Sequence, residues 1–104
     1  MRDIPGFEGL YAVTSCGKVW SYITKKFLKP ELLENGYHRV CLVNGGERHR
    51  FRVHTLVART YLDNPNGYTE VNHLDGNKTN NCVNNLEWCS HSANMLHYIN
   101  VLCP

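Results

Sequence analysis

Residues 70–81 read Glu70-Val71-Asn72-His73-Leu74-Asp75-Gly76-Asn77-Lys78-Thr79-Asn80-Asn81, a short β-prone run followed by a long polar turn. The run ends on a single histidine beside an amide. Asparagine side chains in such turns commonly bond the nearby backbone, so each asparagine taken singly is expected to be structural. These asparagines are Asn77, Asn80, Asn81 and Asn84. His73 alone is also more often a structural residue than a catalyst. Together, however, these residues bring one base and several oxygen donors into one loop.

The polar loop lies between two predicted strands. Residues 70–72 form the first strand, residues 74–84 the loop, and residues 86–89 the second strand. Ser90 or Ser92 is a candidate N-cap for a last helix that runs to about residue 100. The apolar face of that helix consists of Ala93, Leu96 and Ile99. The second half of the chain therefore reads as strand, long loop, strand and helix.

The first half predicts two β-hairpins and a helix. The first hairpin joins residues 10–14 to residues 18–22. The second joins residues 37–43 to residues 48–53 through Asn44-Gly45-Gly46-Glu47, where glycine allows the positive φ angles of a tight turn. Residues 54–62 are expected to be helical, because their apolar side chains recur with a helical period. The stretch that ends this helix is Asp63-Asn64-Pro65-Asn66-Gly67.

Four arginines are predicted to share one face of the second hairpin. Alternate residues of a strand point to the same side, which groups Arg48, Arg50 and Arg52. An odd-sum register through the turn adds Arg39 and Cys41 to that side. Opposed like charges are destabilising unless the face is well solvated or an anion lies on it, and DNA phosphates are such anions. We therefore predict that these arginines bind DNA, with a solvated outer face as the alternative.

Length and composition limit the class of protein. The 104 residues suffice for one domain, and a net charge of +2 does not by itself indicate a nucleic-acid partner. No run approaches the roughly 20 apolar residues that span a bilayer, and the N-terminus lacks the apolar run of a secretory signal. The five cysteines form no C-x-x-C pair, which favours reduced thiols in a cytoplasmic protein over disulfides or structural zinc.

A resemblance to phage and intron-encoded HNH homing endonucleases covers nearly the whole chain. The HNH signature is similar to Asn72-His73-Leu74-Asp75-Gly76-Asn77-Lys78-Thr79-Asn80-Asn81 with Asn85-Leu86-Glu87-Trp88 and Asn94. The modular DNA-binding segment that precedes the HNH core resembles Ile4-Pro5-Gly6-Phe7-Glu8-Gly9-Leu10-Tyr11-Ala12-Val13-Thr14 with Gly17-Lys18-Val19 and Leu28-Lys29-Pro30. The resemblance implies an α+β fold in which N-terminal antiparallel β-hairpins precede a ββα-metal nuclease core. It divides the chain into a β-rich DNA-binding segment, residues 1–53, and a connecting helix with the catalytic core, residues 54–104. We expect both to form one compact unit.

The resemblance also implies roles for individual residues. His73 matches the general base that activates a water to attack the scissile phosphorus. Asn85 matches the asparagine that braces the loop and holds the histidine. Asn72 and Asn94 match the two protein ligands of one divalent metal ion. His97, one helical turn after Asn94, is a candidate phosphate contact, with a packing role as the alternative.

These roles suit hydrolysis of a DNA phosphodiester. Histidine has an ordinary pKa of about 6.5, close to the pH at which the base must act. Oxygen ligands with room for water and phosphate favour Mg²⁺ or Mn²⁺ over a closed zinc site. Two amides carry no charge, so the ion should bind weakly until a DNA phosphate completes its shell. The expected activity is that of a metal-dependent endonuclease acting on double-stranded DNA.

Three departures from the family refine that expectation. Thr55 stands where related chains usually carry arginine, and Asn72 stands where many carry aspartate. The sequence ends at Pro104, before the helical modules of site-specific relatives, which predicts weak specificity and nicking rather than double-strand cleavage. Two alternatives stay open: an inactive DNA-binding module that keeps the HNH fold, and a zinc-stabilised nucleic-acid-binding domain.

Overall fold

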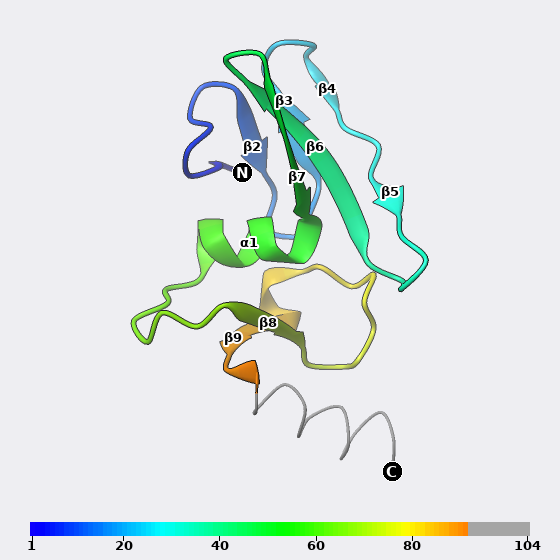
Figure 1. The fold of residues 1–104 in the computed structure, drawn as a ribbon, viewed down its shortest axis with the longest axis vertical. Helices are drawn as coiled ribbons and strands as arrows, with labels where there is room; N and C mark the ends of the chain where they lie inside the picture. The colour runs from blue at the N-terminus through cyan, green and yellow to red at the C-terminus, as the bar shows by residue number, and fades with distance from the viewer. Residues whose placement is uncertain (92–104) are drawn as a thin grey trace.

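Three antiparallel sheets and one α-helix make up residues 1–91, the part of the chain that the computed structural model describes (Figure 1). The first sheet, in the order β1-β2-β3-β4, consists of Arg2–Asp3, Tyr11–Val13, Val19–Ser21 and Lys26–Phe27. The second, in the order β5-β6-β7, consists of Glu31–Leu32, His38–Asn44 and Glu47–Arg52. Helix α1, Val53–Tyr61, follows directly. The third sheet pairs β8, Glu70–His73, with β9, Leu86–Cys89, and the short helix η1, Val83–Asn85, leads into β9.

The predicted α+β class and the antiparallel N-terminal hairpins are confirmed. The second hairpin has the odd-sum register, which sets Arg39 opposite Arg52 and Cys41 opposite Arg50. The strands β1, β4 and β5 were not predicted, because two residues are too few to show a period of two. The predicted last helix falls almost entirely in residues 92–104, outside the described residues.

Helix α1 lies between the N-terminal sheets and the β8–β9 pair, as Figure 1 shows. It buries Val53, Leu56, Val57 and Ala58. The same apolar cluster takes in residues from both predicted parts of the chain, among them Ile4, Val13, Leu42, Val71 and Leu86. Burial on both sides of α1 thus joins the β-rich segment and the β8–β9 pair through one core. The division at residues 53 and 54 remains a prediction.

Within residues 1–91, no helix has the length and apolar character required to cross a membrane.

Candidate active site

His73 is the last residue of β8 and faces the interior, with only 5% of its surface exposed. Its Nε2 lies 2.9 Å from Oδ1 of Asn81. A carbonyl oxygen only accepts hydrogen bonds, so Nε2 must carry the proton and donate it to Asn81. In the neutral ring, Nδ1 then holds the lone pair. The hydrogen bond therefore selects the tautomer in which Nδ1 can accept a proton.

Burial lowers the pKa of His73 below its ordinary value of 6.5. The hydrogen bond to Asn81 and the charge of Asp75 oppose this shift, and the charge of Lys78 adds to it. Burial is the largest of these causes. His73 is accordingly a neutral ring at neutral pH, which is the state a general base requires.

Asn81 is held from the other side by the turn of the first hairpin. A Cβ placed on Gly17, whose φ is +89°, would lie 2.9 Å from Cβ of Asn81 and 3.2 Å from Cγ1 of Val53. The backbone N–H of Val83 also donates to the carbonyl of Ser15 at 2.7 Å. Glycine at this turn lets the N-terminal sheet approach closely and fix the position of Asn81.

Asn85 braces the loop that follows β8. Its amide nitrogen donates to Oδ1 of Asp75 and to the carbonyl of Asn80, both at 2.9 Å. Its Oδ1 accepts the backbone N–H of Asp75 at 3.1 Å, and its backbone carbonyl accepts the N–H of Leu74 at 2.8 Å. These bonds tie the start of the loop to its end. Within residues 1–91, none of the described bonds of Asn85 reaches the imidazole of His73.

Asp75 organises the same loop. Hydrogen bonds from the side chain of Asn80, the backbone of Asn77 and the side chain of Asn85 lower the pKa of its carboxyl group. A carboxylate that accepts several hydrogen bonds is stabilised in its charged form. Asp75 is therefore an anionic hub for the turn.

His54, on the first turn of α1, packs against His73. The two ring centroids are 4.7 Å apart, and the ring of Tyr37 stacks on His54 at 5.0 Å. Burial lowers the pKa of His54 to about 3, with smaller contributions from the neighbouring His73 and Arg52. Its Nδ1 is buried and has no hydrogen-bond partner among the described residues. His54 thus acts as a neutral packing partner of His73.

Asn72 faces Glu87 across the β8–β9 pair, and its amide nitrogen donates to Oε1 of Glu87 at 3.3 Å. This bond uses the nitrogen and leaves the amide oxygen of Asn72 available as a ligand. An amide oxygen beside a carboxylate is a donor set that suits Mg²⁺ or Mn²⁺ rather than a metal that prefers thiolate ligands. The other predicted ligand, Asn94, and the predicted phosphate contact, His97, lie outside the described residues. Within residues 1–91, no three histidine, cysteine or acidic side chains gather as a metal site.

Two family models match this chain. Residues 2–43 match a model described as the NUMOD4 motif, and residues 52–96 match one described as HNH endonuclease. The solved structure described as DNA binding and cleavage by the HNH homing endonuclease I-HmuI superposes with a TM-score of 0.90 at 38% identity, over 99% of this chain and 59% of that chain. Residues 52–96 belong to the HNH endonuclease family.

The relatives within the HNH family are longer than this chain. The DNA endonuclease I-HmuI of Bacillus phage SP01 is 42% identical over 97 residues, which are 90% of this chain and 54% of that protein. An uncharacterized HNH endonuclease of Acanthamoeba polyphaga mimivirus is 44% identical over 89 residues, 86% of this chain and 27% of that protein. The chain therefore spans about half of the phage relative and about a quarter of the mimivirus relative.

The arginines predicted to bind DNA differ in their partners. Arg48, Arg50 and Arg52 are all exposed on β7. Arg39 is paired with Glu31 of β5 at 2.8 Å, and its Nε is buried with no hydrogen-bond partner among residues 1–91. Arg52 lies over the ring of Tyr37, 4.8 Å from its centroid, on the side of the HNH core. Because the ring of Tyr37 also lies near that of His73, Arg52 is linked to His73 through Tyr37.

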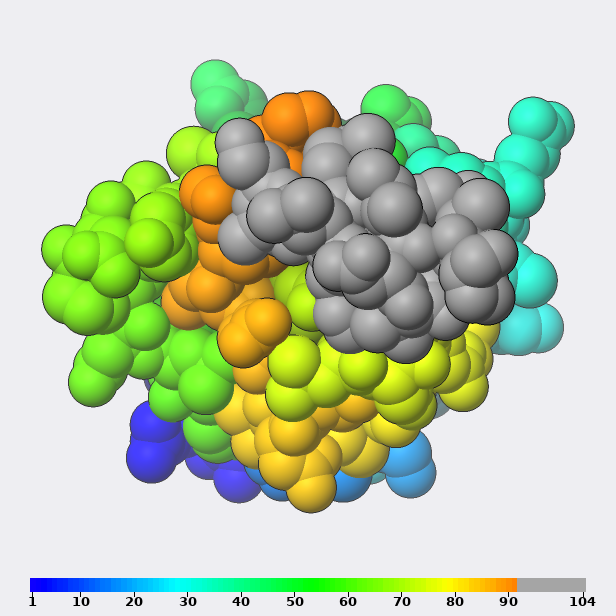
Figure 2. Space-filling view, turned by 90° about the horizontal axis from the view of Figure 1, so that it is seen from below, coloured from blue at the N-terminus to red at the C-terminus, as the bar shows by residue number. Residues whose placement is uncertain are grey.

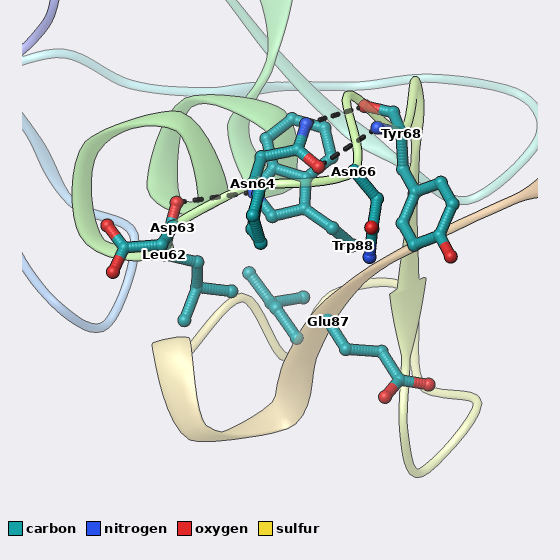
Figure 3. Close-up of a pocket in the computed structure, with 9 residues that line it drawn as sticks. Leu62, Asp63, Asn64, Asn66, Tyr68, Glu87 and Trp88 are labelled. Atoms are coloured by element: carbon teal, nitrogen blue, oxygen red, sulfur yellow. Dashed lines mark hydrogen bonds between the residues drawn. The ribbon is translucent and has the colours of Figure 1, made fainter.

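A groove of about 250 Å³ lies between the exit of α1 and β9 (Figure 3). In it, Trp88 Nε1 donates to the carbonyl of Leu62 at 3.4 Å, and Asn64 exchanges two hydrogen bonds with the backbone of Tyr68. The carboxylate of Glu87 points away from Trp88 in this view. Seen from below, β9 runs between the segment after α1 and the loop after β8 (Figure 2). The groove anchors Trp88, and the imidazole of His73 is not among its lining residues.

Two residues of this site were not predicted to act there. Asn81 was expected to be structural, and Tyr37 was predicted only as part of a strand. The pattern of residues 70–81 offered a signal for Asn81, because it is one of several amides in the loop that follows His73. No local pattern links Tyr37 to the HNH core, since its contact with His73 comes from tertiary packing.

Proposed function

We propose that this chain hydrolyses phosphodiester bonds in double-stranded DNA, with His73 as the general base and one divalent ion, Mg²⁺ or Mn²⁺, as cofactor. The observation that carries the proposal is the hydrogen bond from Nε2 of His73 to Asn81, which leaves Nδ1 as the proton acceptor. Family membership and the DNA endonuclease I-HmuI as a relative support the choice of substrate.

His73 takes the proton of the attacking water on Nδ1. The imidazolium that forms is stabilised by its second N–H, which donates to Asn81. Burial keeps the ring neutral before the reaction, so the base is in its active state at neutral pH. Asn85 keeps the loop, and with it the end of β8, in one conformation. General-base catalysis of this kind is worth about 10²- to 10⁴-fold in rate.

Asn72 and Asn94 are the residues that would hold the divalent ion. When bound, Mg²⁺ or Mn²⁺ supplies Lewis-acid stabilisation of the charge that develops on the leaving oxygen. Asn72 contributes an uncharged oxygen, and Glu87 supplies negative charge directly beside it. Arg48 and Arg50 are proposed to hold the DNA backbone, which orients the duplex without reading its sequence.

Incubation of supercoiled plasmid with Mg²⁺ or Mn²⁺ tests this function. The wild-type chain should convert it to the relaxed form, which indicates nicking, while linear product would indicate double-strand cleavage. His73→Ala should lose at least about 100-fold in rate, and Asn84→Ala, a change at an exposed asparagine of η1, serves as the control. Equal rates for the wild type and His73→Ala would refute the role of His73. DNA binding in EDTA without any cleavage in Mg²⁺ or Mn²⁺ would instead favour the inactive DNA-binding module.

A further inference from the structure

Two cationic side chains converge on one aromatic ring beside His73. The guanidinium carbon of Arg52 lies 4.8 Å from the ring centroid of Tyr37, and Nζ of Lys78 lies 5.0 Å from it. Arg52 closes the second sheet at the end of β7, and Lys78 belongs to the loop after β8. The two parts of the chain thus each supply one cation to the same aromatic surface.

Both cations have N–H groups that make no hydrogen bond within residues 1–91. Lys78 donates to the backbone carbonyl of Asn35 at 2.9 Å, which uses one of its three N–H groups. The guanidinium of Arg52 has no hydrogen-bond partner within residues 1–91, and neither cation pairs with a carboxylate there. Like charges so placed repel each other unless an anion lies between them or the site is well solvated.

A polar pocket of about 130 Å³ opens beside Tyr37. Its lining includes Arg52, His54 and Glu70. The carboxylate of Glu70 accepts a hydrogen bond from Nδ1 of His91 at 2.7 Å. The pocket therefore offers the donors of Arg52 to a small anion.

The aromatic surface is next to the proposed base. The ring centroid of Tyr37 is 5.9 Å from that of His73, and the charge of Lys78 is close enough to act on the His73 ring. The stem of Lys78 passes close to Gly36, where an added Cβ would lie 3.3 Å from Cδ of Lys78. A backbone phosphate bound by these cations would lie near the ring of His73.

We propose that Arg52 and Lys78, both held on the ring of Tyr37, form a phosphate clamp that fixes the DNA backbone beside His73. This inference rests on the proposed DNA substrate, and it names Arg52 and Lys78 as the residues that contact the DNA backbone near His73. Tyr37 is a positioning residue: cation–π attraction holds each cation over the ring, which offsets part of their mutual repulsion before DNA arrives. The clamp does not include Arg48 and Arg50, which lie nearer the start of β7 on the same exposed face as Arg52.

The test measures DNA binding without cleavage, by fluorescence anisotropy of a labelled mixed-sequence duplex in EDTA over a range of NaCl concentrations. Arg52→Met and Lys78→Met keep most of the apolar stem and remove the charge. Each should weaken binding about 10-fold and reduce the salt slope by about one. Tyr37→Leu should reproduce a large part of both losses, while Tyr37→Phe keeps the ring and should bind like the wild type. Circular dichroism of each variant establishes that it is folded before binding is compared.

Each outcome decides the clamp separately from catalysis. Unchanged salt slopes in folded Arg52→Met and Lys78→Met overturn the clamp, even if the wild type nicks plasmid. Reduced slopes support it, even if the wild type proves unable to cleave. Weaker binding in Tyr37→Phe equal to that in Tyr37→Leu would overturn the positioning role of the ring. Should Tyr37→Leu fail to fold, the two methionine variants alone decide whether the clamp exists.

Discussion

Asn81 accepts the Nε2–H of His73 at 2.9 Å, and this bond, rather than any contact from Asn85, touches the imidazole directly. The two asparagines therefore differ in what they contact: Asn81 contacts the ring of His73, and Asn85 contacts the loop that follows it. Asn85 ties the ends of the loop together through Asp75 and Asn80. Asn81 fixes which nitrogen of the ring carries the proton. The division separates two effects that substitutions can measure independently.

Replacing Asn81 should damage catalysis through the tautomer of His73. Asn81→Ala removes the acceptor, and a misoriented base should cost about 100-fold in the nicking rate. Asn81→Asp restores an acceptor with a charge that raises the pKa of His73, so the acid limb of the pH–rate profile should move to higher pH. Nicking assays from pH 5 to 9 measure both effects. An unmoved profile in Asn81→Asp would contradict direct contact between the two side chains.

The turn at Gly17 should matter for activity as well as for stability. Gly17→Ala places a Cβ 2.9 Å from Cβ of Asn81 and forces alanine to a φ of +89°. Gly45→Ala is a matched control, because Gly45 has a φ of +61° but open space around it. Left-handed strain should cost both variants about 1–2 kcal/mol of unfolding free energy. Gly17→Ala should lose about 1–3 kcal/mol more, from the steric overlap.

Urea unfolding and nicking assays distinguish the two glycines. Only Gly17→Ala should also lose nicking activity at a temperature where both variants are folded, since only that change displaces Asn81. Equal activity of the two variants would mean that the hairpin turn does not position Asn81.

The loop sequence predicted the location of the site but not all of its contacts. Residues 70–72 and 86–89 carry strand patterns, so the β8–β9 pair was predictable locally, and β8 extends one residue further to include His73. The choice of Asn81 as the partner of His73 depends on how close Gly17 comes, which is set by packing between segments more than 60 residues apart. Tyr37 was equally inaccessible, because its approach to His54 and His73 requires the second sheet to dock on α1.

Stability should fall as the pH is lowered, through His54. Its pKa is about 3 in the folded chain, against an ordinary value of 6.5. Between these values the unfolded chain binds a proton that the folded chain does not, so the stabilisation is complete above pH 6.5 and decreases toward pH 3. The loss from pH 7 to pH 5 should be about 2 kcal/mol. Burial lowers the pKa of His73 as well, which adds a change of the same sign.

Denaturant titrations at several pH values, without metal or DNA, measure this dependence. His54→Phe keeps a ring for Tyr37 to stack on and removes the titrating group, so its stability should vary less from pH 7 to pH 5. Carboxyl groups contribute little in this window because their pKa values lie below it. The same pH dependence in His54→Phe and the wild type would assign the effect to other groups.

Asn72→Asp should lower the melting temperature without metal and increase the rise in melting temperature that Mn²⁺ causes. The amide of Asn72 donates to Oε1 of Glu87 at 3.3 Å, and a carboxylate in its place would lose that bond and face a like charge. The melting temperature without metal should therefore fall. A charged ligand attracts a hard cation more strongly than an amide does, so Mn²⁺ should bind about 10-fold more tightly and raise the melting temperature more than in the wild type.

Thermal melts with EDTA and with increasing Mn²⁺ test this exchange without relying on cleavage. The double change Asn72→Asp with Glu87→Gln removes the repulsion, so its melting temperature in EDTA should recover while part of the added Mn²⁺ affinity remains. If Asn72→Asp responds to Mn²⁺ no more than the wild type does, Asn72 is not a metal ligand. A loss of melting temperature in EDTA that Glu87→Gln does not relieve would instead show that the Asn72–Glu87 bond is not its cause. The pair thus separates the contribution of Asn72 to the metal site from its contribution to the β8–β9 pair.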